Sequence, residues 1–498
     1  MRLDSLFPRF GRLPAAPLGG LVLAVFFVYL FVVLLGVIAH EPWFDEAQSW
    51  LLSRDASAGQ MLLMYLRYEG HPPLWYALLS APAKLGFPYK TANVLSALSM
   101  AIGVLLFLRL SRVPWALRIV VPFGFFIVYQ YAVVARAYAL FLPVLMAIAH
   151  IYPRRRERVL LFTGLLVVMS NVSLHGLTLA WAFAGLYVLE LAADVRAGRS
   201  LSLAESWRHR LASLLFLLST AGLLIVLWPP NDLLIASELS VERSLFLFQH
   251  VIKKSILPML AGSMWVSVPL AIFFLTWFGR QRMLFTFAAL TLSVQVVTSL
   301  YSNFWHEGIF LLVFLFSLVL SLRLPAPVGW RRATLVMALV VFGHQAWWGV
   351  QTLAYDLENR YSASYEAATF IKLNDLDDRQ IHGLGFSCLA LQPYFEERLL
   401  DNYITDGDFT FWDWSTANPF FHPNSKTRDK GRREAFDKVL AEKPEFLLIG
   451  YKFYSDQYYE LWMKERTDYQ LIRRFDGALY WKSFRVEIES YDLYARVR

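Results

Sequence analysis

The sequence is poor in cysteine: one residue among 498, Cys388, is a cysteine. A single cysteine excludes an internal disulfide and a metal site built from several thiolates. We expect Cys388 to be a small buried apolar residue rather than a reactive thiol. The sequence also lacks a glycine-rich phosphate loop, a zinc-ligand spacing and an internal repeat, so none of these motifs points to a function.

Charged residues are scarce as well, at 17%, and they are unevenly distributed. Residues 1–355 hold 27 Lys and Arg against 14 Asp and Glu, whereas residues 356–498 hold 20 against 25. The net charge of +8 therefore averages two different parts of the chain. The basic excess of the first part belongs to short loops, where it indicates membrane topology and not a nucleic-acid partner.

Apolar residues are abundant: 57% of the chain is hydrophobic, and the mean hydropathy is +0.43. Apolar runs of about 20 residues recur, which predicts a polytopic α-helical membrane protein. The runs are continuous rather than alternating, which argues against a β-barrel. The first run, 18–39, is too long for a cleavable signal peptide, and no small-residue cleavage site follows it.

We predict about eleven membrane spans with a cytoplasmic N-terminus. The predicted spans are 18–39, 91–108, 115–133, 138–152, 159–174, 177–192, 211–228, 263–278, 283–300, 309–322 and 333–352. This topology places 19 of the 27 Lys and Arg of residues 1–355 inside and eight outside, as the positive-inside rule requires. Counting 72–85 as a further span would invert every later loop, so we expect 72–85 to lie on the membrane surface.

Two regions are predicted outside the membrane core. The first outer loop, 41–90, contains two short amphipathic helices, 45–54 and 59–68, and the apolar segment 72–85. The tail, 355–498, is expected to form a soluble α/β domain on the outer side, separate from a membrane domain at 1–354. Its predicted helices are 364–373 and 433–442, and its predicted strands are 380–386, 445–451 and 477–486. An aromatic loop at 409–414 is expected either to rest on the membrane or to cover a site.

Polar residues interrupt the first outer loop at two places. The first is His-Glu-Pro-Trp-Phe-Asp-Glu at 40–46, and the second is Glu-Gly-His-Pro-Pro at 69–73. Asp45 and Glu46 either cap the short helix that begins there or carry chemistry. An Asp held beside apolar walls makes a good general base, because partial burial raises its basicity and a neighbouring cation keeps it ionised.

Other polar residues near the same predicted face also have two interpretations. His71 is either a polar cap before Pro-Pro or a ligand of substrate or metal. Arg136 is either a snorkelling interface residue or an anion-binding group, since its forked guanidinium suits a phosphate. Lys253 and Lys254 either contact lipid headgroups or form a second phosphate clamp. His306 belongs either to an aromatic-belt turn or to the pocket.

The order of these features resembles the GT-C superfamily of membrane glycosyltransferases, in particular protein O-mannosyltransferases and bacterial aminoarabinose transferases. The motifs that carry the resemblance are the Asp-Glu pair at 45–46, Gly-His-Pro-Pro-Leu-Trp-Tyr at 70–76 and Ala-Arg-Ala-Tyr at 135–138. In layout the resemblance covers roughly residues 15–310. The tail carries no motif of this kind.

The resemblance implies a GT-C-like fold and a glycosyltransferase that takes a sugar from a polyprenyl-phosphate donor at the outer face of the membrane. It implies that Asp45 is the catalytic base, with Glu46 supporting it or contacting the acceptor. Arg136 and Tyr138 match positions near the donor phosphate. The candidate substrate-binding residues are Glu69, His71, Arg136, Tyr138, Lys253, Lys254 and His306.

Such a transfer is a single displacement that inverts the anomeric carbon, and cations stabilise the departing phosphate in place of a general acid. The acceptor is a lipid, a glycan or a protein, and no cofactor is firmly predicted, with a divalent metal ion left open. We expect the protein in the bacterial inner membrane with its tail in the periplasm. Two alternatives are a lipid or solute transporter, which would show an internal repeat, and a non-catalytic scaffold that acts through its tail.

Overall fold

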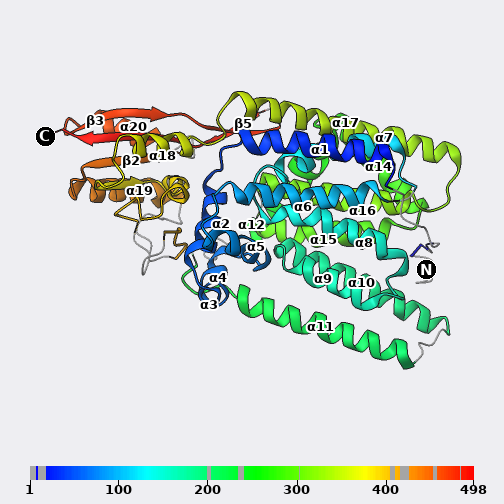
Figure 1. The fold of residues 1–498 in the computed structure, drawn as a ribbon. Coiled ribbons are helices and arrows are strands. Elements are labelled where there is room, and N and C mark those ends of the chain that lie inside the picture. Colours follow the sequence, from blue (N-terminus) through cyan, green and yellow to red (C-terminus); the bar gives the residue numbers. More distant parts are fainter. Residues whose placement is uncertain are drawn as a thin grey trace.

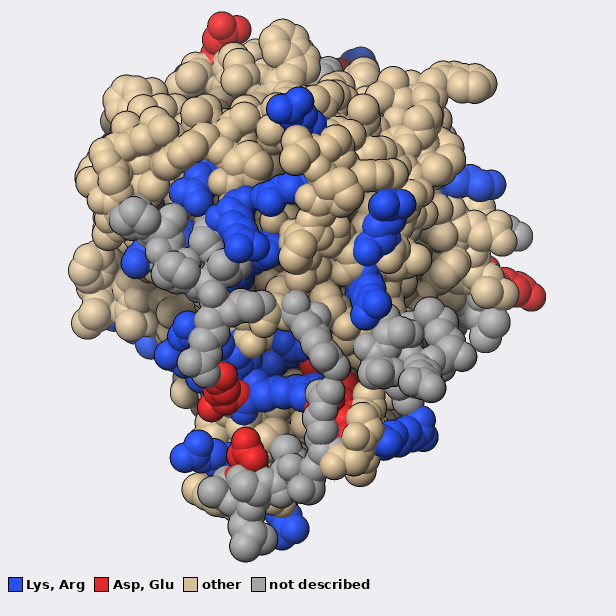
Figure 2. All heavy atoms as spheres, turned by 90° about the vertical axis from the view of Figure 1, so that its right-hand side faces the viewer, with Lys and Arg blue, Asp and Glu red and all other residues tan. Residues whose placement is uncertain are grey.

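The computed structural model describes residues 7–8, 10, 18–110, 112–198, 203–233, 241–301, 303–403, 410–415, 425–451, 457–482 and 484–497. Figure 1 shows a bundle of roughly parallel helices joined at one end to a smaller part that contains the strands. The short helices of the first loop lie at this junction, beside both parts. Figure 2 views the opposite end of the bundle, where many Lys and Arg side chains gather.

Ten helical segments of the described part correspond to ten of the eleven predicted spans. Seven are long and apolar enough to cross a membrane: α1 (Gly20–Ala39), α6 (Thr91–Leu108), Ala137–Arg154 around α8 (Phe141–Ile151), α10 (Leu174–Arg196), Glu205–Leu227 within α11 (Leu203–Leu227), Phe304–Ser321 including α16 (Glu307–Ser321), and α17 (Val328–Glu358). Three are shorter: α9 (Val159–Ser170), α14 (Met264–Arg280) and α15 (Leu284–Leu300). The chain is therefore a multi-pass helical membrane protein.

The remaining predicted span, 115–133, is not a continuous helix. It is divided into α7 (Trp115–Val120), η3 (Val121–Phe123) and η4 (Phe126–Gln130). Pro122 lies in η3 and Gly124 is extended, and both residue types interrupt a helix. Residues 125–135 are all buried. Irregular backbone at membrane depth is tolerated when protein surrounds it, and the part of this segment from residue 125 onward is surrounded in this way.

Short helices fill the loop between α1 and α6, as predicted. They are α2 (Phe44–Asp55), α3 (Ala58–Gln60), η2 (Met61–Tyr65), α4 (Leu66–Glu69) and α5 (Leu74–Lys84). Gly70 ends α4 with φ +62°, a left-handed conformation that glycine adopts without steric cost. The 11 residues of α5 extend about 16 Å at 1.5 Å per residue, which is too short to cross a bilayer. A second set follows α11: α12 (Val241–Val251), η8 (Ile252–Ile256) and α13 (Leu257–Ala261).

The tail contains a four-stranded sheet with strand order β1-β2-β6-β3. The strands are β1 (Ile381–Leu384), β2 (Phe446–Tyr451), β3 (Tyr469–Phe475) and β6 (Ser490–Arg496), with β1 and β2 parallel and the other pairs antiparallel. The helical elements are α18 (Ser364–Leu373), η10 (Phe386–Tyr394), α19 (Ser425–Ala441) and α20 (Gln457–Lys464). The predicted strand 477–486 is instead a hairpin of β4 (Ala478–Trp481) and β5 (Phe484–Ile488).

The β4–β5 hairpin anchors the tail in the helical bundle. The ring of Trp481 packs on Phe125 and Phe126, with ring centroids 4.9 and 5.6 Å apart. The next residue, Lys482, is buried, and its Nζ lies 2.7 Å from Oε2 of Glu307, the first residue of α16. A buried charge needs such a partner, so the hairpin and α16 are fixed to each other.

A buried chain of ionisable groups joins three helices at the junction. His40, just beyond α1, contacts the Glu46 carboxylate of α2 at 3.0 Å through Nε2 and the Asp356 carboxylate of α17 at 3.1 Å through Nδ1. The Tyr129 hydroxyl donates to the same Asp356 oxygen at 3.0 Å. Burial lowers the pKa of His40, but the two carboxylates outweigh burial and raise this pKa to about 9. His40 is therefore a cation at neutral pH.

The protonation of His40 predicts that stability falls as the pH rises. The folded pKa of about 9 lies above the ordinary histidine value of about 6.5. The stabilisation is thus fully present below pH ~6.5 and is lost as the pH rises through about 9. Thermal unfolding of the purified protein should show a loss of roughly 3 kcal/mol across this window.

The comparison for this measurement is His40→Asn, which should be less stable at pH 6.5 and should lose that pH dependence. His250→Asn is a matched control, since His250 is exposed on α12. A wild-type melting temperature that stays constant from pH 6.5 to 9.5 would contradict the charged state of His40.

Candidate active site

Asp45 lies in the first turn of α2, where the chain leaves the membrane after α1. Its carboxylate Oδ2 is 3.3 Å from Nη1 of Arg136, and the same Nη1 donates to the Asp45 backbone carbonyl at 3.0 Å. The two side chains are only 19% and 16% exposed. The structure thus brings together the predicted base and the predicted phosphate-binding residue, which are 91 positions apart in the sequence.

Glu46 points away from Asp45 into the protein, and hydrogen-bond donors occupy both of its oxygens. Oε2 accepts from the Trp43 backbone N–H at 3.1 Å and contacts His40. Oε1 accepts from Asn93 at 2.7 Å and from the backbone N–H of Ala135 at 2.6 Å. Ala135 precedes Arg136. One buried carboxylate therefore fixes the start of α2 and the segment that carries the Arg136 guanidinium.

Glu69 ends α4 and faces the same centre. Its Oε1 accepts from Gln48 at 2.6 Å and from the Trp414 indole N–H at 3.0 Å, and its Oε2 accepts from the Tyr76 hydroxyl at 3.4 Å. Burial raises the pKa of Glu69, and the Asp45 charge raises it further, while Arg136 acts in the opposite direction. Glu69 is therefore close enough to the Asp45–Arg136 pair to respond to both charges.

His71 follows Gly70 and lies near the same two charges. Burial is the main cause that lowers its pKa, to about 3, and Arg136 lowers it as well. His71 is therefore neutral at ordinary pH. Its Nδ1 is buried and has no hydrogen-bond partner in the described part of the structure, which leaves a polar atom for a ligand to satisfy.

Tyr138 and His306 form a polar pair on the bundle side. The Tyr138 hydroxyl lies 3.1 Å from Nε2 of His306. The Asn303 backbone N–H donates to Nδ1 of His306 at 3.2 Å, so the proton of the neutral ring is on Nε2 and points to Tyr138. The His306 ring also lies against His175, with centroids 4.4 Å apart. Both ring nitrogens of His306 therefore make hydrogen bonds, one of them with Tyr138.

The two predicted lysines, Lys253 and Lys254, lie in η8. Lys253 is exposed in η8, and the Lys254 side chain lies outside the described residues. Among the described residues, no group of three or more His, Cys, Asp and Glu side chains is arranged to hold a metal ion. Within the described residues, Arg136 is a charged partner of Asp45.

The tail contributes contacts that no sequence pattern predicts. Glu489 accepts hydrogen bonds from the Phe44 backbone N–H, at 3.2 and 3.3 Å to its two oxygens, and so caps α2 one residue before Asp45. The Gln48 side-chain amide pairs with the backbone of Trp412 through bonds of 3.0 and 2.7 Å. These partners are more than 360 positions apart, and no local pattern marks such pairings.

The aromatic loop predicted at 409–414 packs over the site. Phe409 lies outside the described residues, while residues 410–415 contact α2 through Gln48 and α4 through Glu69. Thr410 also bonds Asp55, at 2.9 Å from its backbone N–H and 2.5 Å from its hydroxyl. These contacts place residues 410–415 beside Gln48 and Glu69.

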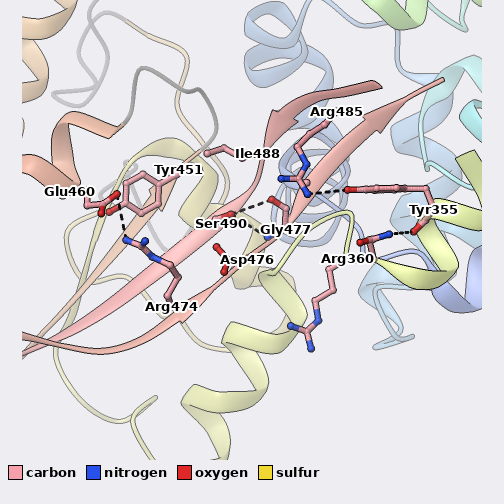
Figure 3. A pocket seen from close by; sticks show the side chains of 12 residues that line it. Tyr355, Arg360, Tyr451, Glu460, Arg474, Asp476, Gly477, Arg485, Ile488 and Ser490 are labelled. Atoms are coloured by element: carbon pink, nitrogen blue, oxygen red, sulfur yellow. Dashed lines mark hydrogen bonds and ion pairs between the residues drawn. The ribbon is translucent and has the colours of Figure 1, made fainter. Parts of the chain in front are cut away.

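A cavity of about 510 Å³ lies where the tail meets the end of α17. Figure 3 shows two of its arginines beside partners: Arg474 lies 3.6 Å from Glu460, and Arg485 donates to the Tyr355 hydroxyl at 3.3 Å. Arg474 also pairs with Asp492 at 2.7 Å. These arginines make structural contacts. The Asp45–Arg136 centre is not part of the cavity lining.

No protein-family model matches the chain, and the search of curated proteins gave no match. A match among solved structures is the crystal structure of ArnT from Cupriavidus metallidurans bound to undecaprenyl phosphate. The two share 14% sequence identity and superpose with a TM-score of 0.50, over 95% of this chain and 98% of ArnT. The fold of this chain is thus that of ArnT, which agrees with the resemblance between its sequence motifs and those of GT-C membrane glycosyltransferases.

Proposed function

We propose that the protein is a glycosyltransferase that moves a sugar from a polyprenyl-phosphate-linked donor to an acceptor at the outer face of the membrane. The observation that carries this proposal is the contact between Asp45 and Arg136, which joins a carboxylate to a phosphate-binding group where the bundle meets the tail. The fold likeness to a transferase solved with undecaprenyl phosphate supports the same donor class.

In the proposed reaction, the Asp45 carboxylate removes the proton of the acceptor hydroxyl while the acceptor oxygen attacks the anomeric carbon of the donor sugar. The bond from that carbon to the phosphate oxygen breaks, and the phosphate leaves with the electron pair. Arg136 stabilises the charge that develops on the phosphate. Its Nη1 makes both contacts with Asp45, and a guanidinium has five N–H donors, so Arg136 can bridge the base and the leaving group.

The neighbouring residues take supporting roles in this proposal. Glu46 positions Asp45 and Arg136 through the backbone rather than touching substrate, because its oxygens already accept four contacts. His71 offers the unpartnered Nδ1 to the substrate. Glu69, Tyr138 and His306 line the space around the donor. We assign no role to Lys253 and Lys254, since of the two side chains only that of Lys253 is described and it is exposed.

Asp45→Asn tests the base. The substitution keeps the size of the side chain and removes its ability to take a proton. Transfer from a panel of polyprenyl-phosphate sugars should fall by about 10²–10⁴-fold in kcat, while the melting temperature and the affinity for undecaprenyl phosphate change little. Asp377→Asn, in an exposed part of the tail, should retain wild-type transfer. Full activity of Asp45→Asn would rule out Asp45 as the base.

Arg136 tests the donor site by a different measurement, the binding of undecaprenyl phosphate itself. Arg136→Ala removes the cation, so affinity should drop by roughly one to two orders of magnitude, the scale of a charge-assisted hydrogen bond to a phosphate. Arg136→Lys keeps the charge without the fork and should fall between. Lys253→Ala serves as the comparison at the exposed lysine. Unchanged affinity in Arg136→Ala would remove this residue from the donor site.

We further propose that the tail faces the periplasm of a bacterial inner membrane. The Lys and Arg side chains that gather at the opposite end of the bundle (Figure 2) are the signature of a cytoplasmic face. Cys388, the only cysteine, is buried, so single cysteines can be introduced on a silent background. In intact spheroplasts, Asp377→Cys should react with a membrane-impermeant maleimide and Arg332→Cys should not; the reverse pattern would invert the topology.

A further inference from the structure

A second cavity, of about 250 Å³, lies between the tail loop 410–415 and the surface helices η2 and α4. Its walls come from three parts of the chain: Tyr65 and Tyr68 from the helices, Asp232 from the segment after α11, and Phe411, Trp412 and Trp414 from the tail. The loop is tied to its neighbours on both sides, through the Trp414–Glu69 hydrogen bond and a backbone bridge between Leu233 and Ser415. The loop that forms one wall of the cavity is therefore held in place from two sides.

The walls combine aromatic rings with carboxylates. The rings of Tyr65 and Phe411 pack with centroids 4.6 Å apart, and those of Trp412 and Trp414 lie 6.4 Å apart. The indole N–H of Trp412 is buried with no acceptor in the described part of the structure. A ligand with hydroxyl groups can satisfy such a donor, and aromatic rings provide apolar faces against which the C–H face of a sugar ring packs.

Three carboxylates complete the cavity: Glu69, Asp232 and Asp413. The Tyr68 hydroxyl donates to both oxygens of Asp232, at 3.0 and 3.1 Å, and the Ser415 N–H and hydroxyl donate to Asp413 at 2.8 and 2.9 Å. Carboxylates accept hydrogen bonds from hydroxyls and repel phosphates. No Lys or Arg is among the cavity's lining residues, so the cavity favours a ligand without a phosphate.

Glu69 connects this cavity to the proposed catalytic centre. Glu69 lines the cavity, and it is also near the proposed catalytic centre, since the charge of Asp45 raises the pKa of its carboxyl and the charge of Arg136 lowers this pKa. A ring bound here would approach the base from the tail side, whereas the donor phosphate belongs at Arg136. The size of the cavity suits one sugar ring, since cavities for larger ligands are usually above ~300 Å³.

We propose that this aromatic–acidic cavity is the acceptor subsite and that it binds one ring of a neutral, hydroxyl-rich saccharide. This inference rests on the proposed transferase function for the word acceptor, while the binding of a neutral saccharide stands by itself. It gives the tail a direct part in substrate recognition: Trp412 and Trp414 supply the stacking faces, and Asp232 and Asp413 accept from the hydroxyls.

The test is saturation-transfer NMR on the full chain in lipid nanodiscs free of sugar-based detergent. The probes are a panel of methyl glycosides of common hexoses and N-acetylhexosamines. At least one should show saturation transfer with the wild type, and its affinity should fall at least tenfold in Trp414→Ala and severalfold in Asp232→Asn. Asp232 is exposed, so its variant should fold. The 6-phosphate of the same sugar should bind at least tenfold more weakly.

Two controls separate this proposal from the proposed reaction. Trp265→Ala, at a 91% exposed tryptophan of α14, should bind the glycoside as the wild type does. Asp45→Asn should also retain binding while losing transfer. The subsite is overturned if no glycoside binds, if binding survives both Trp414→Ala and Asp232→Asn, or if the phosphate binds equally well. Glycoside binding without any transferase activity would instead overturn the reaction and leave the saccharide site standing.

Discussion

The rest of this site depends on the hydrogen bonds that the buried carboxylate of Glu46 accepts. A charge removed from water is costly unless donors surround it, and here the donors come from four places: His40, the start of α2, α6 through Asn93, and the segment before Arg136. Removing the carboxylate would leave those donors unsatisfied together. The position of Asp45 relative to Arg136 is thus set by a residue that faces away from both.

The tail continues the same construction from the other side. Glu489 holds the N-terminus of α2, the hairpin carrying Lys482 enters the bundle beside Glu307, and the loop 410–415 packs on α2 and α4. Each contact pairs polar groups that are buried or partly buried. The tail therefore contacts the elements that carry the candidate site, although its composition differs from that of the bundle.

Local physical signals in the sequence were enough to predict the membrane architecture. Apolar runs and the positions of arginine depend on the bilayer, so the spans and the surface helices of the first loop were found without tertiary contacts. The segment 115–133 was predicted as one continuous helix because its hydropathy is that of a span, but Pro122 and Gly124 interrupt the helix. Strands β3 and β6 were missed because they do not alternate cleanly: residues 470–474 of the edge strand β3 are exposed, and β6 carries the buried Asp492.

In the candidate site too, sequence motifs identified some residues, while other contacts were found only in the structure. Asp45, Glu69, His71 and Arg136 were chosen from motifs, and the structure places them within reach of one another's charges. The contributions of Gln48, Trp414 and Glu489 depend on pairings across hundreds of residues, which one sequence does not display. Asp45 and Glu46 are adjacent in the chain, and the sequence likewise does not show that their side chains point in opposite directions.

The capping of α2 by Glu489 has a consequence for biogenesis. Phe44, at the start of α2, precedes its capping residue Glu489 by 445 positions. During synthesis this cap on α2 can therefore form only after Glu489 has been made. A protein truncated before Glu489 would lack this contact with the first loop.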